Sequence, residues 1–158
     1  MSSEAHVKFQ SVISRIQDRF PNLEGEFTDP SPAVDLAYEM RAQSGLQADV
    51  LLNLQNEDEF HLCIGLHFWD EWFPCLAEGV SEEYLEMICG FISGTHRVVD
   101  YYRGTGCWKS VLQVDSQNRW KTVSLSRHIG GGSWSWSKRS QKIITNREQG
   151  GGGQPDTR

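Results

Sequence analysis

The side chains best suited to chemistry lie in residues 60–69, where apolar and polar residues alternate. This period of two predicts a β-strand with five apolar residues on one face and His61, Cys63 and His67 on the other. Side chains two positions apart on one strand face are about 6.6–6.8 Å apart, so His61 and Cys63 could share a metal ion. Along an ideal strand His67 lies about 20 Å from His61, which is too far to join them.

Two ligands are too few for a metal site. A structural zinc ion takes four protein ligands, and the register expected for the sheet places Asn53 and Leu51 beside this pair, not carboxylates. The four cysteines show neither a C-x-x-C pair nor zinc-finger spacing. We therefore expect no metal and no cofactor, and free thiols at Cys63, Cys75, Cys89 and Cys107.

A cysteine nucleophile is the second kind of chemistry that these residue types allow. It needs a nearby base and a group that orients the base. Cys63 with His61 or His67, and Cys107 with His128, are the pairs to consider, but no local sequence matches a nucleophile motif. A cysteine-dependent enzyme therefore stays an alternative function, and no catalytic residue is assigned.

Aromatic and acidic residues are unusually dense at the end of this strand and directly after it, and three acidic residues stand directly before it. Such a segment is either a flap that caps the end of the sheet or an anchor for a protein partner, because Trp and Tyr dominate interface hot spots. Acidic neighbours would favour a partner with a basic surface and speed its approach. The predicted partner-binding residues are Glu57, Asp58, Glu59, Trp69, Asp70, Glu71, Trp72 and Phe73.

The formal charge is divided along the chain. Residues 1–102 hold eighteen acids against five Lys and Arg, a formal −13, whereas residues 103–158 hold three acids against ten, a formal +7. If the later strands join the same sheet, much of this charge neutralises internally. The segments 57–59 and 70–71 would then remain unpaired, one at each end of the strand 60–69.

The last third of the chain also interleaves bases with aromatic residues. Cations beside stacking platforms are typical of proteins that hold single-stranded nucleic acid, so a nucleic-acid-associated protein is a further alternative. A net charge of −6 argues against a general nucleic-acid binder. The instances are Trp108-Lys109, Arg119-Trp120-Lys121, Arg127-His128 and Trp134 to Arg139.

The patterns around these residues predict an α+β fold. We expect an N-terminal helix, an antiparallel meander, a second helix with Ser81 as N-cap, and further antiparallel strands, with the helices packed on the sheet face. Matching the apolar faces pairs Leu54 with Phe60, Leu52 with Leu62 and Met40 with Val50. The expected helices span 4–20 and 81–93, and the expected strands lie near 23–28, 34–41, 49–55, 60–69, 97–102, 110–115, 120–125 and 134–145.

One domain, residues 1–147, accounts for these elements, followed by a glycine-rich tail over 148–158. No apolar run reaches the 18–20 residues or so of a membrane helix, and we see no secretory signal, so we expect a cytoplasmic location. In the order of its elements alone, the chain resembles small acidic chaperones of bacterial secretion systems. The leading hypothesis is a protein-binding module without catalysis, of the immunity-protein, inhibitor or secretion-chaperone type, and a homodimer remains open.

Overall fold

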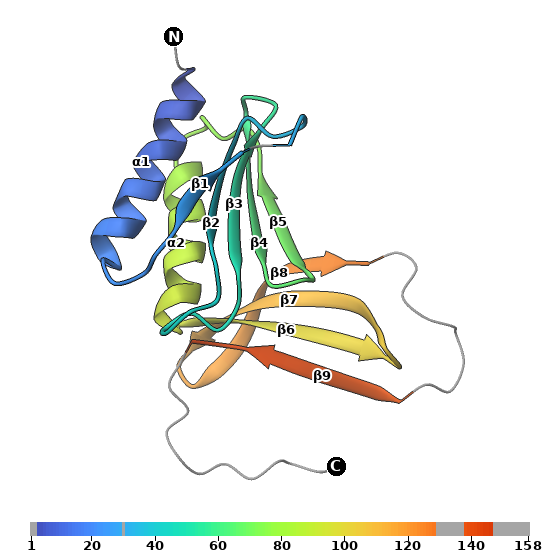
Figure 1. The fold of residues 1–158 in the computed structure, drawn as a ribbon. Coiled ribbons are helices and arrows are strands. Elements are labelled where there is room, and N and C mark those ends of the chain that lie inside the picture. The colour runs from blue at the N-terminus through green and yellow to red at the C-terminus, as the bar shows by residue number, and fades with distance from the viewer. Residues whose placement is uncertain (1–2, 30, 129–137, 147–158) are drawn as a thin grey trace.

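The computed structural model describes residues 3–29, 31–128 and 138–146, which form two helices and two antiparallel sheets (Figure 1). Helix, meander, second helix and further strands follow one another along the chain, so the predicted α+β class is confirmed. Neither of the described helices is long and apolar enough to cross a membrane.

Both helices form where an apolar stripe is bounded by stop signals. Helix α1 (Glu4–Arg19) buries Phe9, Ile13 and Ile16 and ends before Pro21, which disfavours helical geometry at the preceding residue. Helix α2 (Val80–Ser93) ends at Gly94, whose φ of 79° suits glycine. The predicted N-cap of α2 was wrong, because the cap is Gly79 and Ser81 lies inside the helix.

The first sheet has the order β1-β2-β3-β4-β5. The pairs Leu54–Phe60, Leu52–Leu62 and Met40–Val50 are all observed, so the predicted register is confirmed. Burying the apolar set of each strand fixes this register, since a slip of one residue would turn that set outward. The strands are β1 (Glu26–Thr28), β2 (Leu36–Met40), β3 (Val50–Gln55), β4 (Glu59–Ile64) and β5 (Phe68–Trp72).

The single strand predicted over 60–69 was wrong. Gly65, with a φ of 62°, begins a turn through His67, and the chain reverses to form the β4–β5 hairpin. Leu66 continues the apolar alternation of the sequence, yet 91% of it is exposed at the turn. As a result His67 does not share a strand face with His61 and Cys63, and residues 68–72 form an edge strand instead of a flap.

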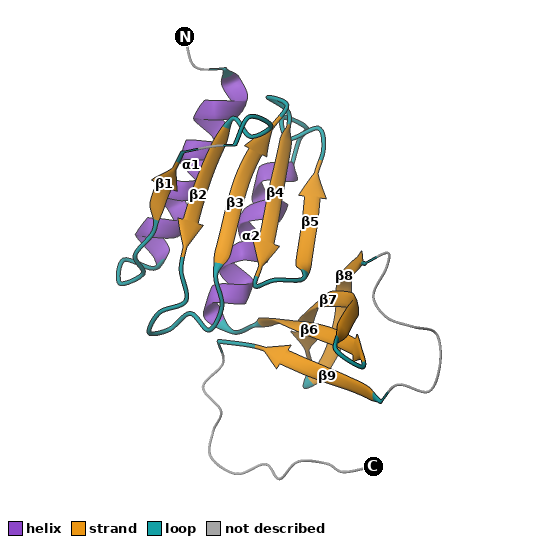
Figure 2. Cartoon of the chain, turned by 45° about the vertical axis from the view of Figure 1, so that its right-hand side comes forward, coloured by secondary structure: helices purple, strands orange, loops and turns teal. Residues whose placement is uncertain are grey.

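The later strands form a second sheet of order β8-β7-β6-β9 and do not join the first one. Its strands run across the direction of the first sheet, below its lower end in Figures 1 and 2. Gln117 and Asn118 both have positive φ in the two-residue turn between β7 and β8, as a tight hairpin requires. The strands are β6 (His96–Arg103), β7 (Gly106–Ser116), β8 (Arg119–Arg127) and β9 (Arg139–Ile144).

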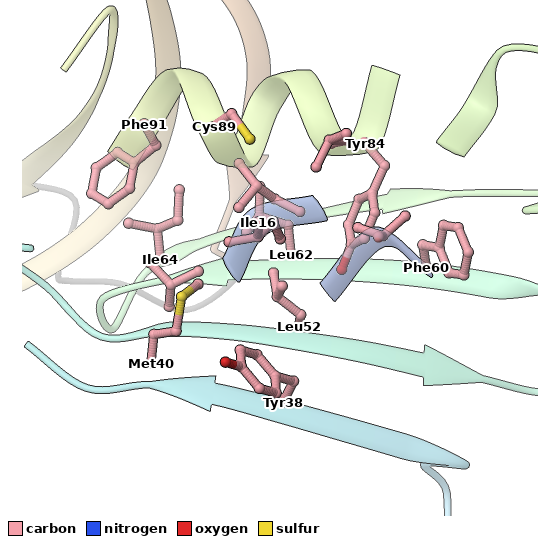
Figure 3. Packing of buried hydrophobic residues seen from close by; sticks show 14 of the residues in the cluster. Ile16, Tyr38, Met40, Leu52, Phe60, Leu62, Ile64, Tyr84, Cys89 and Phe91 are labelled. Carbon is pink, nitrogen blue, oxygen red and sulfur yellow. The ribbon is translucent and has the colours of Figure 1, made fainter. Parts of the chain in front are cut away.

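The core lies between the helices and one face of the first sheet (Figure 2). Ile16 of α1 and Tyr84, Cys89 and Phe91 of α2 lie against the inward side chains of β2, β3 and β4 (Figure 3). Side chains of the second sheet join the same buried cluster, so one core links both sheets. They are Val98, Leu112 and Ile144.

Some predicted segments lie outside the described residues. They are the glycine-rich loop at 129–133, the first part of the strand predicted at 134–145, and the tail at 148–158.

Candidate functional site

The β4–β5 hairpin brings the two acidic segments of the sequence to the same end of the first sheet. Phe60 is paired with Trp72, and the backbone N–H of Cys75 donates to the carbonyl of Asp58 at 2.8 Å. The turn before β4 and the end of β5 are therefore neighbours (Figure 1). The expectation of one acidic segment at each end of a strand was wrong, because the chain reverses at Gly65.

The aromatic residues of β5 and its end differ in their exposure. Trp69 is 46% exposed and Phe73 is 66% exposed, whereas Trp72 is only 8% exposed and lies edge-on to Tyr84 in the core. Alternation along the strand explains the difference, because Trp72 shares the helix-covered face with Phe68. Two of the three predicted aromatic anchors are therefore accessible.

The backbone of this edge strand is partly capped by side chains. The N–H of Trp69 donates to Ser126 Oγ at 2.9 Å, and the Ser126 hydroxyl donates back to the Trp69 carbonyl. The N–H of Glu71 donates to Asp70 Oδ1 at 2.9 Å. A strand edge whose backbone groups are already hydrogen-bonded resists pairing with another strand. This edge therefore presents side chains to solvent more than free backbone N–H and C=O groups.

His61 lies on the face of the first sheet that the helices leave uncovered, between two carboxylates. It is paired with Glu71 across the β4–β5 ladder, and its Nε2 lies 3.3 Å from Glu59 Oε2. The expectation that no carboxylate flanks His61 was wrong, because β5 adds a neighbour that a single strand would not have. The ligand atoms of Glu59, His61 and Glu71 lie within 4.8 Å of one another, so this group could hold a cation.

The four thiols are all free, and burial raises the pKa of each of them. For Cys75 burial and the nearby Asp58 raise the pKa to about 11. The thiolate is the nucleophilic form of cysteine, and a reactive thiol has a lowered pKa. The surroundings of these cysteines are those of structural thiols.

The structure nevertheless joins one predicted cysteine–histidine pair and adds a second histidine to it. Ligand atoms of His67, Cys107 and His128 lie within 4.8 Å of one another. The residues come from the β4–β5 turn, from β7 and from the residue after β8. The β7–β8 pairing brings His128 beside Cys107, whereas only the packing of one sheet on the other adds His67, for which the sequence carries no signal.

The basic and aromatic residues of the second sheet lie in pairs along its strands. The Arg97 guanidinium lies 4.1 Å from the ring centroid of Trp120, and Lys109 Nζ lies 4.3 Å from that of Tyr101. Arg103 lies over Trp108, at 4.9 Å. Cation–π pairs of this kind occupy the aromatic faces on which the bases of a nucleic acid would stack.

The division of charge in the sequence is a division between layers of the molecule. Described residues 3–95 hold seventeen acids and four Lys and Arg, whereas described residues from His96 onwards hold two acids and nine Lys and Arg. Three ion pairs between described residues join Arg15 to Glu82, Arg41 to Glu39 and His61 to Glu59. Each of these pairs joins two residues within 3–95. None of them pairs an acidic residue of the first layer with a basic residue of the second sheet.

Comparison with known proteins gives no match, whether to a family model, a curated protein or a solved structure. The function must therefore be inferred from the residues of this chain.

Proposed function

We propose that this chain is a non-catalytic protein-binding module that binds a partner with a basic surface through one end of its first sheet. The surface, which we name the acidic–aromatic patch, consists of Glu57, Asp58, Glu59, Trp69, Asp70, Glu71 and Phe73. The observation that carries the proposal is the β4–β5 hairpin, which joins the two acidic segments at one end of the sheet, with Phe73 exposed beside them and Trp69 exposed further along β5.

The charge of the patch favours a basic partner. Among the described residues, Glu59 is paired with His61, and no Lys or Arg forms an ion pair with the carboxylates of the patch. Like charges held close together repel one another, and a cationic surface relieves that repulsion on binding. Complementary charge also speeds the encounter of the two proteins.

The exposed aromatic residues supply apolar area beside this charge. The backbone of Trp69 is held by Ser126, and the Trp69 ring lies 5.6 Å from the ring of His61, centroid to centroid. An anchor that is already held in place loses little conformational freedom when a partner binds. Phe73 is the most exposed aromatic side chain among the described residues and is the second anchor.

The backbone at Glu57 supports the same proposal. Glu57 has a φ of 55°, a conformation that costs free energy for any residue except glycine. Its N–H donates to Asp35 Oδ2 at 2.7 Å, which fixes the turn. An acidic residue kept where glycine would be more stable is a reason to infer a role for its side chain.

Binding accounts for these features better than catalysis or nucleic-acid recognition. Each thiol has a raised pKa, which argues against cysteine chemistry, and three aromatic rings of the second sheet already carry their own cations. A small protein that blocks, protects or escorts another protein needs only a complementary surface. An immunity protein, an inhibitor and a secretion chaperone all act in this way.

The aromatic anchor gives the test of this proposal. The full chain, its Phe73→Ser variant and its Phe27→Ser variant are immobilised and used to capture proteins from native lysate of the source cells. Phe27 is the matched control, because it is 50% exposed on β1, the opposite edge strand. We expect Phe73→Ser to lower the amount of captured partner at least tenfold, because a hot-spot residue contributes about 2 kcal/mol or more to binding.

Thermal unfolding of each variant checks that its fold is intact. Equal capture by Phe73→Ser and Phe27→Ser, or capture of no specific protein by the unmodified chain, would contradict the proposal.

A further inference from the structure

A cysteine and two histidines meet where the β4–β5 turn of the first sheet packs against the second sheet. His67 lies in that turn, Cys107 is near the start of β7, and His128 directly follows β8. The His128 N–H donates to the Trp108 carbonyl at 3.1 Å, which continues the β7–β8 pairing and holds His128 beside Cys107. The rings of His67 and His128 are 5.6 Å apart, centroid to centroid, and nearly perpendicular.

We propose that this group binds a zinc ion, or a divalent ion of similar softness, through Cys107 Sγ and one ring nitrogen each of His67 and His128. Thiolate sulfur and imidazole nitrogen are the preferred ligands of zinc, and three protein ligands with one water complete a tetrahedral site. The site lies at the turn end of the β4–β5 hairpin, near Trp69 and away from the acidic segments of the acidic–aromatic patch, and it does not depend on the function proposed for that patch.

The geometry needs only a small adjustment. In a tetrahedral zinc site the ligand atoms are about 3.3–3.6 Å apart, as follows from Zn–S and Zn–N bonds of about 2.3 and 2.0–2.1 Å. The three ligand atoms lie within 4.8 Å of one another. His67 lies in a turn and is partly exposed, so its side chain can rotate. That rotation would bring its ring nitrogen closer to the other two ligand atoms.

A second observation points to a missing ligand. His128 Nε2 is buried and makes no hydrogen bond to any described residue. A buried polar atom without a partner costs free energy, and coordination to a metal ion would remove that cost.

One buried carboxylate near the group also suits a cation. Asp100, which is 2% exposed and accepts a 2.5 Å hydrogen bond from Ser110, places a negative charge near Cys107. Arg103 and Lys109 lie over the ring of Trp108, the residue that follows Cys107 and has no Cα partner on β6. Lys142, paired with Asp100 across the sheet, has an exposed side chain.

One of the three ligands, His67, faces a pocket beside the site. The pocket, of about 270 Å³, lies between the β4–β5 turn and the second sheet, and its lining also includes Asp100, Tyr102 and Lys142. An ion bound beside it would connect the first sheet to two strands of the second. We therefore expect the bound metal to stabilise the packing of one sheet on the other.

The test uses Co²⁺ as a spectroscopic probe for the zinc site. The full chain is freed of metal with EDTA and titrated with Co²⁺, and the thiolate-to-cobalt charge-transfer absorption is recorded in the near ultraviolet. We expect the absorption to saturate at one ion per chain and to disappear when Zn²⁺ is added. Cys107→Ser and His128→Asn should abolish it.

Two control variants separate this site from the other candidates on the chain. Cys63→Ser removes the one thiol of the four that is not buried, and Glu71→Gln alters the Glu59–His61–Glu71 group. Both should keep the absorption. Zn²⁺ should raise the midpoint of thermal unfolding of the unmodified chain and of both controls, and should leave that of Cys107→Ser unchanged.

Absence of the absorption in the unmodified chain, its survival in Cys107→Ser, or its loss in Cys63→Ser would overturn the proposal. If circular dichroism shows that Cys107→Ser is unfolded, His67→Asn replaces it, because His67 lies in a turn and its loss leaves the core intact.

Discussion

His96 is the buried ionisable group whose surroundings give the clearest consequence for stability. It is 6% exposed, and an added Cβ on Gly90 would lie 2.0 Å from its Nδ1, so the ring fits against a residue without a side chain. Burial lowers the pKa of His96 from 6.5, and the nearby Glu86 opposes that shift only in part. Folding therefore favours the neutral imidazole.

This pKa shift predicts the direction of a pH dependence. The unfolded chain binds a proton at His96 below about pH 6.5, whereas the folded chain resists it. The contribution of His96 to stability is therefore complete above about pH 6.5 and is lost as the pH falls toward the lower pKa of the folded state. Urea titrations of the unmodified chain and of His96→Asn measure this contribution. We expect the difference between their unfolding free energies to decrease as the pH is lowered through this window. A difference that is flat with pH would refute the assignment.

Single residues are where prediction from the sequence was weakest. The acidic and aromatic residues of the patch could be singled out by their density, but the burial of Trp72 depends on alternation in a strand that was not expected. His67, Cys107 and His128 could not be joined as a group of three, because their proximity arises from the packing of two sheets.

At the scale of elements, the β3–β4 turn links stability to the proposed function. Asn56 and Glu57 both have positive φ, the geometry in which Asn-Gly is the preferred pair. We expect Glu57→Gly to raise the unfolding free energy by about 0.5–1 kcal/mol, since glycine removes the strain of the left-handed conformation. The same change should weaken partner capture, because it removes one carboxylate of the patch.

Asn118→Gly is the matched control, at the same position of the β7–β8 turn in the second sheet. It should leave partner capture unchanged. A loss of stability in Glu57→Gly, or undiminished capture, would contradict this account of the turn.

Most elements could be predicted because each buries one face, which imposes a period on its sequence. The register of β2, β3 and β4 followed from matching those faces. The prediction failed at Gly65, because Leu66 and Phe68 continue the alternation of β4 through a turn. Glycine inside an apparent strand was the available signal, since it often marks a turn or a bulge.

At the scale of the whole molecule, acidic and basic residues lie in different layers. The first sheet and its helices carry most of the acidic residues, and the second sheet carries most of the basic ones. Alternation along a strand tells which residues face the core, but not which other strand lies beside it. The sequence therefore left open whether residues from His96 onwards extend the first sheet, and in the structure they form their own. The acidic charge of the first layer consequently stays available to a partner.

The central claim is that the acidic–aromatic patch binds a partner, and a pair of charge reversals tests it most directly. Glu57→Lys/Glu71→Lys alters two exposed carboxylates of the patch, and Glu24→Lys/Glu26→Lys changes the net charge equally near the opposite edge of the sheet. We expect quantitative capture from native lysate to fall at least tenfold for the first variant and to be unchanged for the second. Equal retention of the partner by both variants would show that the patch does not bind it.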